Sequence, residues 1–160
     1  MTDKAFQDYY PPSLSYCYGC GRLNPAGLHI KSNWDGDEGV CRFTPRSEHI
    51  AVPGYVYGGL IASLIDCHGT GTAAAAAYRY ENRTVETLPA YRFVTAALHV
   101  DYLLPTPLGV ELELRARVGE IKTHPDKIGT ARVYKVTLEI RLLAAGKQCA
   151  RGQVVAVQAS

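Results

Sequence analysis

The sequence lacks the features that would place it in several specialised classes of protein. It has no run of lysines or arginines, and its formal net charge is only +2 over 160 residues, so no nucleic-acid partner is expected. Its longest apolar stretch is broken by Asp66, His68 and several glycines, which predicts that the chain does not span a membrane. The polar start, Met1 to Lys4, does not resemble a signal peptide. A single ordinary globular domain with a substantial core is therefore predicted.

The cysteines provide neither an even count nor a second CxxC pair. There are five, and an odd number without a signal peptide favours reduced thiols and a cytoplasmic location. Cys17 and Cys20 form one CxxC, but zinc would need two more ligands. A thioredoxin-like site would need a βαβ context that the sequence does not show. We therefore expect no metal, and interpret the CxxC as a turn with small, partly buried thiols.

Charge is almost absent from the middle of the chain. Between Glu48 and Arg79 the only formally charged residue is Asp66. It follows Gly59 by seven residues, or two helical turns, which puts both on one face of a predicted helix. Bulky apolar residues flank this face, and a helix that is apolar nearly all round is buried. A buried carboxylate is costly, so Asp66 is a candidate functional group. The alternative is a structural aspartate satisfied by backbone or by a distant arginine.

The rest of the pattern predicts one helix and a sheet. Residues 1–26 form an irregular lead-in, with a short helix near Lys4–Tyr9, and residues 27–160 form a single domain. The helix is predicted over 58–78, where Gly69 and Gly71 indicate close packing. Alternation and turn signals predict strands at 27–34, 39–44, 91–104, 110–118, 134–142 and 148–157. One long helix must cover one antiparallel sheet of about six strands, which is an α+β architecture.

Three motifs in this order resemble the hotdog-fold acyl-CoA thioesterases of the PaaI-like group, over about residues 17–157. The first is Cys17-Tyr-Gly-Cys-Gly21, followed by Asn24-Pro25 and Gly27-Leu28. The second is Phe43-Thr-Pro45, Pro53-Gly54, Gly58-Gly59 and Asp66. The third is Val100-Asp-Tyr-Leu-Leu-Pro-Thr106 with Gly109. The resemblance implies a curved sheet wrapped around the central helix.

The resemblance also implies a chemistry. Asp66 matches the carboxylate that activates water or attacks the thioester carbonyl directly. Gly58 matches the helix-start amide that holds the oxyanion, with Gly59 beside it, and free amides at a helix N-terminus suit that task. Thr95 matches the strand hydroxyl that positions the water. The family's site is shared between subunits, so a homodimer or a dimer of dimers is implied, with an acyl-CoA as substrate and no other cofactor.

The chain departs from the family pattern in front of the glycine pair. The family usually has histidine where this chain has Tyr57, and often a polar amide where Ile50 and Ala51 stand. We expect Tyr57, Val56, His49 and Ser63 to contribute to substrate binding. An apolar, aromatic-lined loop around Tyr57 would favour medium-length or aryl acyl groups over acetyl. The Tyr57 hydroxyl is expected to form a hydrogen bond.

Two other readings remain open at this point. A hotdog protein could bind acyl thioesters without turning them over, and the changes at Tyr57, Ile50 and Ala51 are compatible with that. Retention of Asp66 argues against it, because a simple binder gains little from a desolvated carboxylate. A hotdog dehydratase or hydratase is the other alternative, and the absence of the family histidine argues against it.

Overall fold

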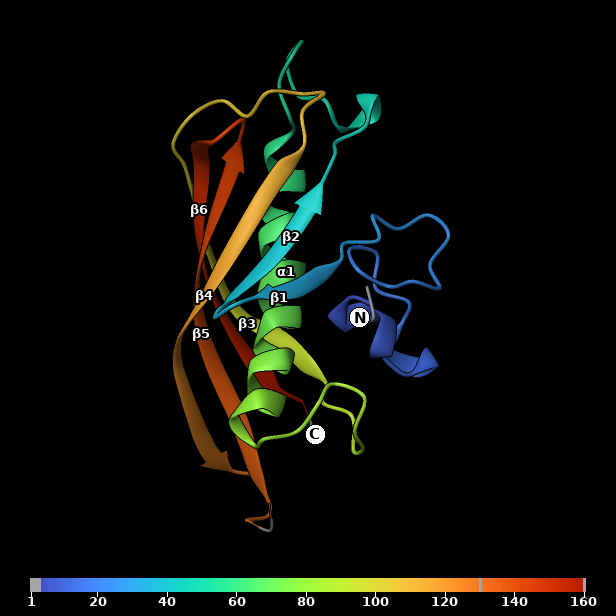
Figure 1. Cartoon of the computed structure of the whole chain (residues 1–160), viewed down its shortest axis with the longest axis vertical. Helices are drawn as coiled ribbons and strands as arrows, with labels where there is room; N and C mark the ends of the chain where they lie inside the picture. The colour runs from blue at the N-terminus through green and yellow to red at the C-terminus, as the bar shows by residue number, and fades with distance from the viewer. Residues whose placement is uncertain (1–3, 130, 160) are drawn as a thin grey trace.

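The computed structural model describes residues 4–129 and 131–159, so the first three residues of the predicted lead-in, residue 130 and the last residue lie outside it. One long helix, α1 (Gly58–Tyr80), lies along the inner face of a curved antiparallel sheet (Figure 1). Its strand order is β1-β2-β4-β5-β6-β3. The strands are β1 (Ser32–Asp35), β2 (Glu38–Phe43), β3 (Phe93–Tyr102), β4 (Leu112–Pro125), β5 (Arg132–Ala144) and β6 (Lys147–Gln158). The predicted hotdog fold is confirmed.

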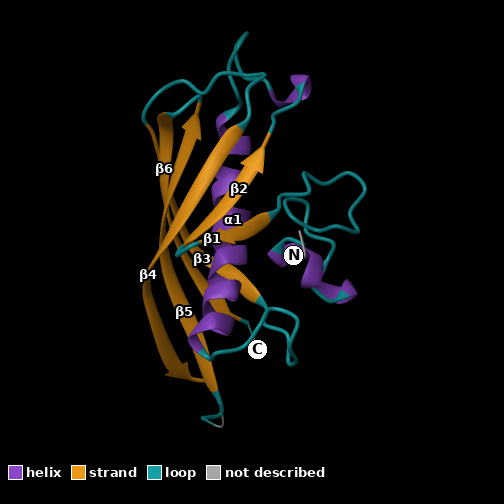
Figure 2. Ribbon diagram, viewed as in Figure 1, coloured by secondary structure: helices purple, strands orange, loops and turns teal. Residues whose placement is uncertain are grey.

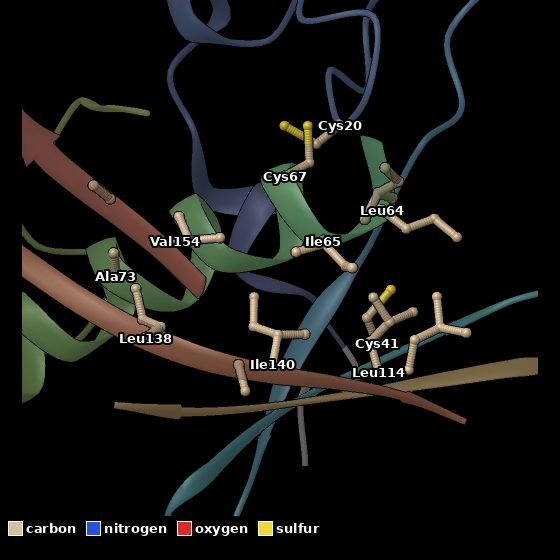
Figure 3. Packing of buried hydrophobic residues seen from close by; sticks show 14 of the residues in the cluster. Cys20, Cys41, Leu64, Ile65, Cys67, Ala73, Leu114, Leu138, Ile140 and Val154 are labelled. Atoms are coloured by element: carbon tan, nitrogen blue, oxygen red, sulfur yellow. The ribbon is translucent and has the colours of Figure 1, made fainter. Parts of the chain in front are cut away.

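Helix α1 begins where the sequence predicts and extends two residues beyond the predicted end at Tyr78. The helix is apolar on nearly all sides because the sheet covers one side and the N-terminal segment covers part of the other (Figure 2). Gly69 is needed for this packing, because a Cβ there would lie 2.7 Å from a methyl carbon of Val154 in β6. Figure 3 shows Leu138 and Ile140 directed from β5 toward the helix. No described helix is long and apolar enough to cross a membrane.

The first strand is shorter than predicted. It starts at Ser32 rather than at residue 27. The preceding residues bond to a different partner: the amides of Leu28 and Ile30 donate to the carbonyls of Tyr18 and Gly19, at 2.8 and 2.9 Å. The alternating stretch therefore pairs in its first half with the CxxC loop and only in its second half with the sheet.

The fourth predicted strand, 110–118, is longer in the structure. It becomes β4 and continues to Pro125. The register with β5 shifts between Val118 and Glu120, which leaves Gly119 as a bulge. A bulge adds one residue and inverts the inside–outside alternation beyond it. The period-two pattern from which the strand was predicted therefore stops at Val118, although the strand does not.

A chain of buried polar groups connects the N-terminal segment to the helix. The Gln7 side chain donates to Ser32 Oγ at 3.1 Å, and Ser32 Oγ lies 2.8 Å from His68 Nδ1. His68 Nε2 lies 3.1 Å from the Gly39 carbonyl oxygen. A carbonyl only accepts, so Nε2 carries the proton and Nδ1 accepts from the serine hydroxyl. Burial lowers the pKa of His68 to about 4, which keeps the ring neutral. His68 is therefore a hydrogen-bonded core residue.

Strand β3 forms one end of the sheet. It pairs with β6 on one side, and no described strand pairs with its other side. Its apolar side chains are unusually accessible: Val94 and Leu98 are 41% and 40% exposed, and Tyr102 is 55% exposed. A long edge strand with exposed apolar side chains invites pairing with another chain.

Candidate active site

Asp66 and Thr95 meet between the helix and the edge strand. The Thr95 hydroxyl donates a hydrogen bond to Asp66 Oδ1. The β3–β6 register shifts between Thr95 and Ala97, and such bulges re-aim neighbouring side chains. Asp66 is half-buried, not fully buried as the sequence predicted, because its carboxylate lines a cavity. The geometry therefore brings together two of the four predicted catalytic residues, while their roles stay predictions.

The cavity beside Asp66 has a volume of about 360 Å³ and an open mouth, within the range of small-molecule sites. Aromatic side chains supply much of its wall: Tyr10, Tyr16, Tyr91 and Phe93. Sequence reasoning placed the aromatic lining in the loop before the helix, and so missed these four residues. The tyrosine-rich composition of the N-terminal segment was the available signal, but composition alone does not say which surface a segment covers.

The glycine pair forms the first turn of α1. The amides of Leu60 and Ile61 bond to the Tyr57 carbonyl at 3.1 and 3.4 Å. This leaves the amides of Gly58 and Gly59 without a partner inside the helix. The Tyr102 hydroxyl donates to the Gly58 carbonyl at 2.8 Å and fixes this end of the helix. The arrangement presents free N–H groups that can receive an oxyanion.

Tyr57 lies against this turn. Its ring occupies the space that a side chain on Gly59 would need. It is 59% exposed in the single chain, so burial does not force its hydroxyl to find a partner. Val56 is buried and lines a groove beside Gly58 that is separate from the Asp66 cavity.

The other two predicted binding residues, His49 and Ser63, form hydrogen bonds with residues close to them in the sequence. The His49 ring accepts from the Arg46 amide at 3.0 Å and lies 5.8 Å from the Phe43 ring. The Ser63 hydroxyl donates to the Gly59 carbonyl one turn earlier, at 2.9 Å. Neither lines the Asp66 cavity.

The predicted oxyanion amide and the predicted carboxylate are far apart within one chain. Gly58 and Asp66 are eight residues apart on a continuous helix, which corresponds to about 12 Å along its axis. One thioester carbonyl cannot contact both. The structure thus separates the predicted site into a carboxylate half and an amide half.

Three thiols adjoin the carboxylate half. Cys17, Cys20 and Cys67 line the same cavity as Asp66. Hydrogen bonds from the other two thiols lower the pKa of Cys17, and the bond to Cys17 raises that of Cys20. The Asp66 carboxylate contributes to the rise at Cys20. The sequence pattern predicted a plain turn at Cys17 and Cys20 and gave no signal that would mark Cys67.

Comparison with known proteins identifies the family. The family model of the Thioesterase superfamily matches residues 53–124. A solved Thioesterase superfamily protein from Shewanella loihica is 45% identical, with a TM-score of 0.66, and the match covers 94% of this chain and 100% of that one. The chain belongs to the thioesterase superfamily. The predicted resemblance is thereby confirmed.

Two more distant structures share the fold with this thioesterase superfamily member. The PaaI protein of the Escherichia coli phenylacetic acid degradation operon is 16% identical, with a TM-score of 0.59, covering 83% of this chain and 81% of that one. A Streptococcus mutans protein bound to acetyl-CoA is 12% identical, with a TM-score of 0.60, covering 87% and 97%. A search of curated proteins gave no match.

Proposed function

We propose that this protein hydrolyses acyl thioesters, with an acyl-CoA as substrate and no further cofactor. The observation that carries the proposal is the Asp66 carboxylate, which accepts a hydrogen bond from Thr95 and lines an aromatic-walled cavity. Membership of the thioesterase superfamily supports the reaction class. The binding of acetyl-CoA by a protein of the same fold supports the carrier.

The proposed reaction uses Asp66 as a general base. The carboxylate takes a proton from a water molecule as the water oxygen attacks the thioester carbonyl carbon. The resulting oxyanion accepts hydrogen bonds from the free amides at a helix start. The intermediate then collapses, the carbon–sulfur bond breaks, and the coenzyme A thiolate leaves and is protonated. Thr95 holds the carboxylate in position. Direct attack by Asp66, through an anhydride that water then cleaves, is the second route with the same residues.

Completing the site requires a second copy of the chain. Asp66 and Gly58 of one chain lie about 12 Å apart along the helix axis, whereas an oxyanion donor must lie about 3 Å from the reacting oxygen. The exposed apolar edge of β3 carries Thr95 and ends at Tyr102, which contacts Gly58. Pairing of two β3 edges would cover this surface. We therefore propose a homodimer whose sites combine Asp66 of one protomer with the Gly58 amide of its partner.

The first experiment measures release of free thiol from acetyl-, hexanoyl- and phenylacetyl-CoA. We expect turnover, with higher kcat/KM for the last two, because aromatic side chains line the cavity. Asp66→Asn should lower kcat about a hundredfold or more, the usual scale of a general base. Asp35→Asn, an exposed aspartate on β1, is the matched control and should retain parental turnover. Turnover by Asp66→Asn within a few-fold of the parent would contradict the role of Asp66.

A complementation experiment tests the shared site. Gly58 is the first helical residue, where proline is tolerated. Gly58→Pro therefore removes the amide hydrogen with little disturbance, and should be inactive. Co-refolding Gly58→Pro with Asp66→Asn produces mixed dimers in which one of the two sites is intact, so about a quarter of parental activity should return if assortment is random. Failure of the mixture to exceed its separate components would rule out a site built from two chains.

A further inference from the structure

Three cysteine thiols from two distant segments converge beside the central helix. Cys17 and Cys20 come from the N-terminal loop, and Cys67 comes from α1. Their sulfur atoms all lie within 4.8 Å of one another, and the Cys17 and Cys67 sulfurs are 3.9 Å apart. Figure 3 shows the Cys20 and Cys67 sulfurs side by side at the edge of the core. The sequence has no second CxxC, and the third thiol of this cluster comes from the helix instead.

The spacing of the sulfurs matches that of a tetrahedral metal site. Zinc binds thiolate at about 2.3 Å, so two sulfurs on one tetrahedral zinc ion lie about 3.8 Å apart. The Cys17 and Cys67 sulfurs are 3.9 Å apart, which agrees with this sulfur–sulfur distance within 0.1 Å. The other two sulfur–sulfur distances are at most 4.8 Å. The side chains would therefore move by about 1 Å or less to bind one zinc ion.

The loop that carries Cys17 and Cys20 is held in shape by its backbone. The Gly21 amide donates to the Cys17 carbonyl at 2.8 Å, and the Ile30 amide donates to the Gly19 carbonyl at 2.9 Å. Two positions exclude any side chain. A Cβ on Gly19 would overlap the Cys67 sulfur, and a Cβ on Gly21 would overlap backbone atoms of Cys17. The loop therefore approaches α1 as closely as a shared ligand requires.

We propose that Cys17, Cys20 and Cys67 form a zinc site, with the fourth coordination position open to a water molecule on the cavity side. Three thiolates select a soft, tetrahedral cation, and zinc meets that description without redox chemistry. Each ligating sulfur releases its proton to solvent when the metal binds. A disulfide between two of these thiols is the competing chemistry, but it would leave the third unused.

The zinc ion would cross-link the N-terminal loop to the helix next to Asp66. Tyr16, adjacent to Cys17, lines the Asp66 cavity, as do all three thiols. The metal would thus fix one wall of that cavity. The inference does not depend on the proposed hydrolysis, and metal content can be measured on protein without any activity.

The first test is elemental analysis of the full chain, produced with zinc and purified under a non-chelating reductant. A single zinc ion per chain is expected. Cys17→Ser and Cys67→Ser should each lose it, whereas Cys149→Ala, which changes a buried cysteine outside the cluster, should retain it. Cys17 is exposed, so this variant can be interpreted even if Cys67→Ser fails to fold. Equal zinc in Cys17→Ser and the parent would show adventitious binding and overturn the proposal.

The second test identifies the ligands by cobalt substitution. Co²⁺ in the reduced parent should show near-ultraviolet sulfur-to-cobalt charge-transfer bands and tetrahedral visible bands, and Cys17→Ser should lack them. Gly19→Ala keeps all three thiols but displaces Cys67, and should also lose the bands. An octahedral cobalt spectrum, or a metal-free reduced protein with no affinity for either ion, would refute the site. So would a native mass short of two hydrogens, the signature of a disulfide.

Discussion

The contact between Gly152 in β6 and Ile65 in α1 offers a strict test of how the helix is held against the sheet. A Cβ added to Gly152 would overlap Cγ2 of Ile65 and lie 3.3 Å from its Cδ1. Ile65 is fully buried, so it has little room to move away. Overpacking of this kind costs about 1–3 kcal/mol. Replacing a strand glycine with alanine otherwise gains about 0.5–1 kcal/mol. We therefore expect Gly152→Ala to destabilise the protein by about 0.5–2 kcal/mol, the difference of these two effects.

The same substitution should change sign when Ile65 is truncated. Ile65→Ala alone should cost about 2–5 kcal/mol. In that background the nearest remaining atom to the new Cβ is the His99 carbonyl oxygen at 3.4 Å, an ordinary contact. Gly152→Ala should then stabilise by about 0.5–1.5 kcal/mol, from backbone entropy and partial filling of the cavity.

Urea unfolding of the four proteins, at one fixed concentration and under reductant, measures this cycle. The coupling energy between the two positions should be about 1–3.5 kcal/mol. An equal effect of Gly152→Ala in both backgrounds would refute the close contact between α1 and β6. Activity gives a second readout, because Ile65 precedes Asp66 and Gly152 pairs with Val100 of β3. A helix pushed away from the sheet should lengthen the Thr95–Asp66 hydrogen bond and lower kcat.

Three further predictions concern single features. Thr95→Val should lower kcat about tenfold, the equivalent of one lost hydrogen bond, and Thr95→Ser should restore most of it; no change with valine would exclude the hydroxyl. Burial lowers the pKa of His68 from 6.5 to about 4, so its stabilisation is complete above pH 6.5 and is lost as the pH falls toward 4, by about 2 kcal/mol at pH 5. Urea titrations at pH 7 and 5 should show this loss in the parent and not in His68→Gln. Leu98→Lys on the β3 edge should weaken self-association at least about tenfold, since burying one leucine contributes about 1.5–3 kcal/mol; an unchanged sedimentation profile would place the interface elsewhere.

The sequence predicted those parts of the fold that depend on local pattern. The isolated charge at Asp66 and the glycine pair before it located the helix to the residue at its start. Turn chemistry located the last hairpin, where Ala145 and Gly146 both adopt positive φ. The errors arose where a long-range contact overrides the pattern. Residues 27–31 alternate as a strand does, yet bond to the CxxC loop.

The candidate site was predictable only in part, for the same reason. Thr95 could be matched to Asp66 through the family pattern, and the structure places them in contact. The cavity walls could not be predicted, because Tyr10 and Tyr91 belong to segments far apart in the sequence that meet only in the folded chain. The position of Cys67 beside the CxxC could not be predicted from the sequence either. It lies 47 residues after Cys20, with no spacing that marks it as a third ligand, and only the packing of the loop on α1 brings the sulfurs together.

The role of Tyr57 could not be predicted for a different reason, which is the rigidity of the helix that follows it. A helix is rigid, so Gly58 and Asp66 stay about 12 Å apart in any fold that keeps α1 intact. No rearrangement of one chain can bring the Tyr57–Gly58 turn to the Asp66 cavity. In the proposed dimer, the partner subunit would cover the β3 edge and change the exposure of Tyr57, which is 59% in the single chain. If two copies pair along β3, Tyr57 of one protomer approaches the Asp66 cavity of its partner. Its contribution to substrate choice is then decided by a contact that neither the sequence nor the single chain contains.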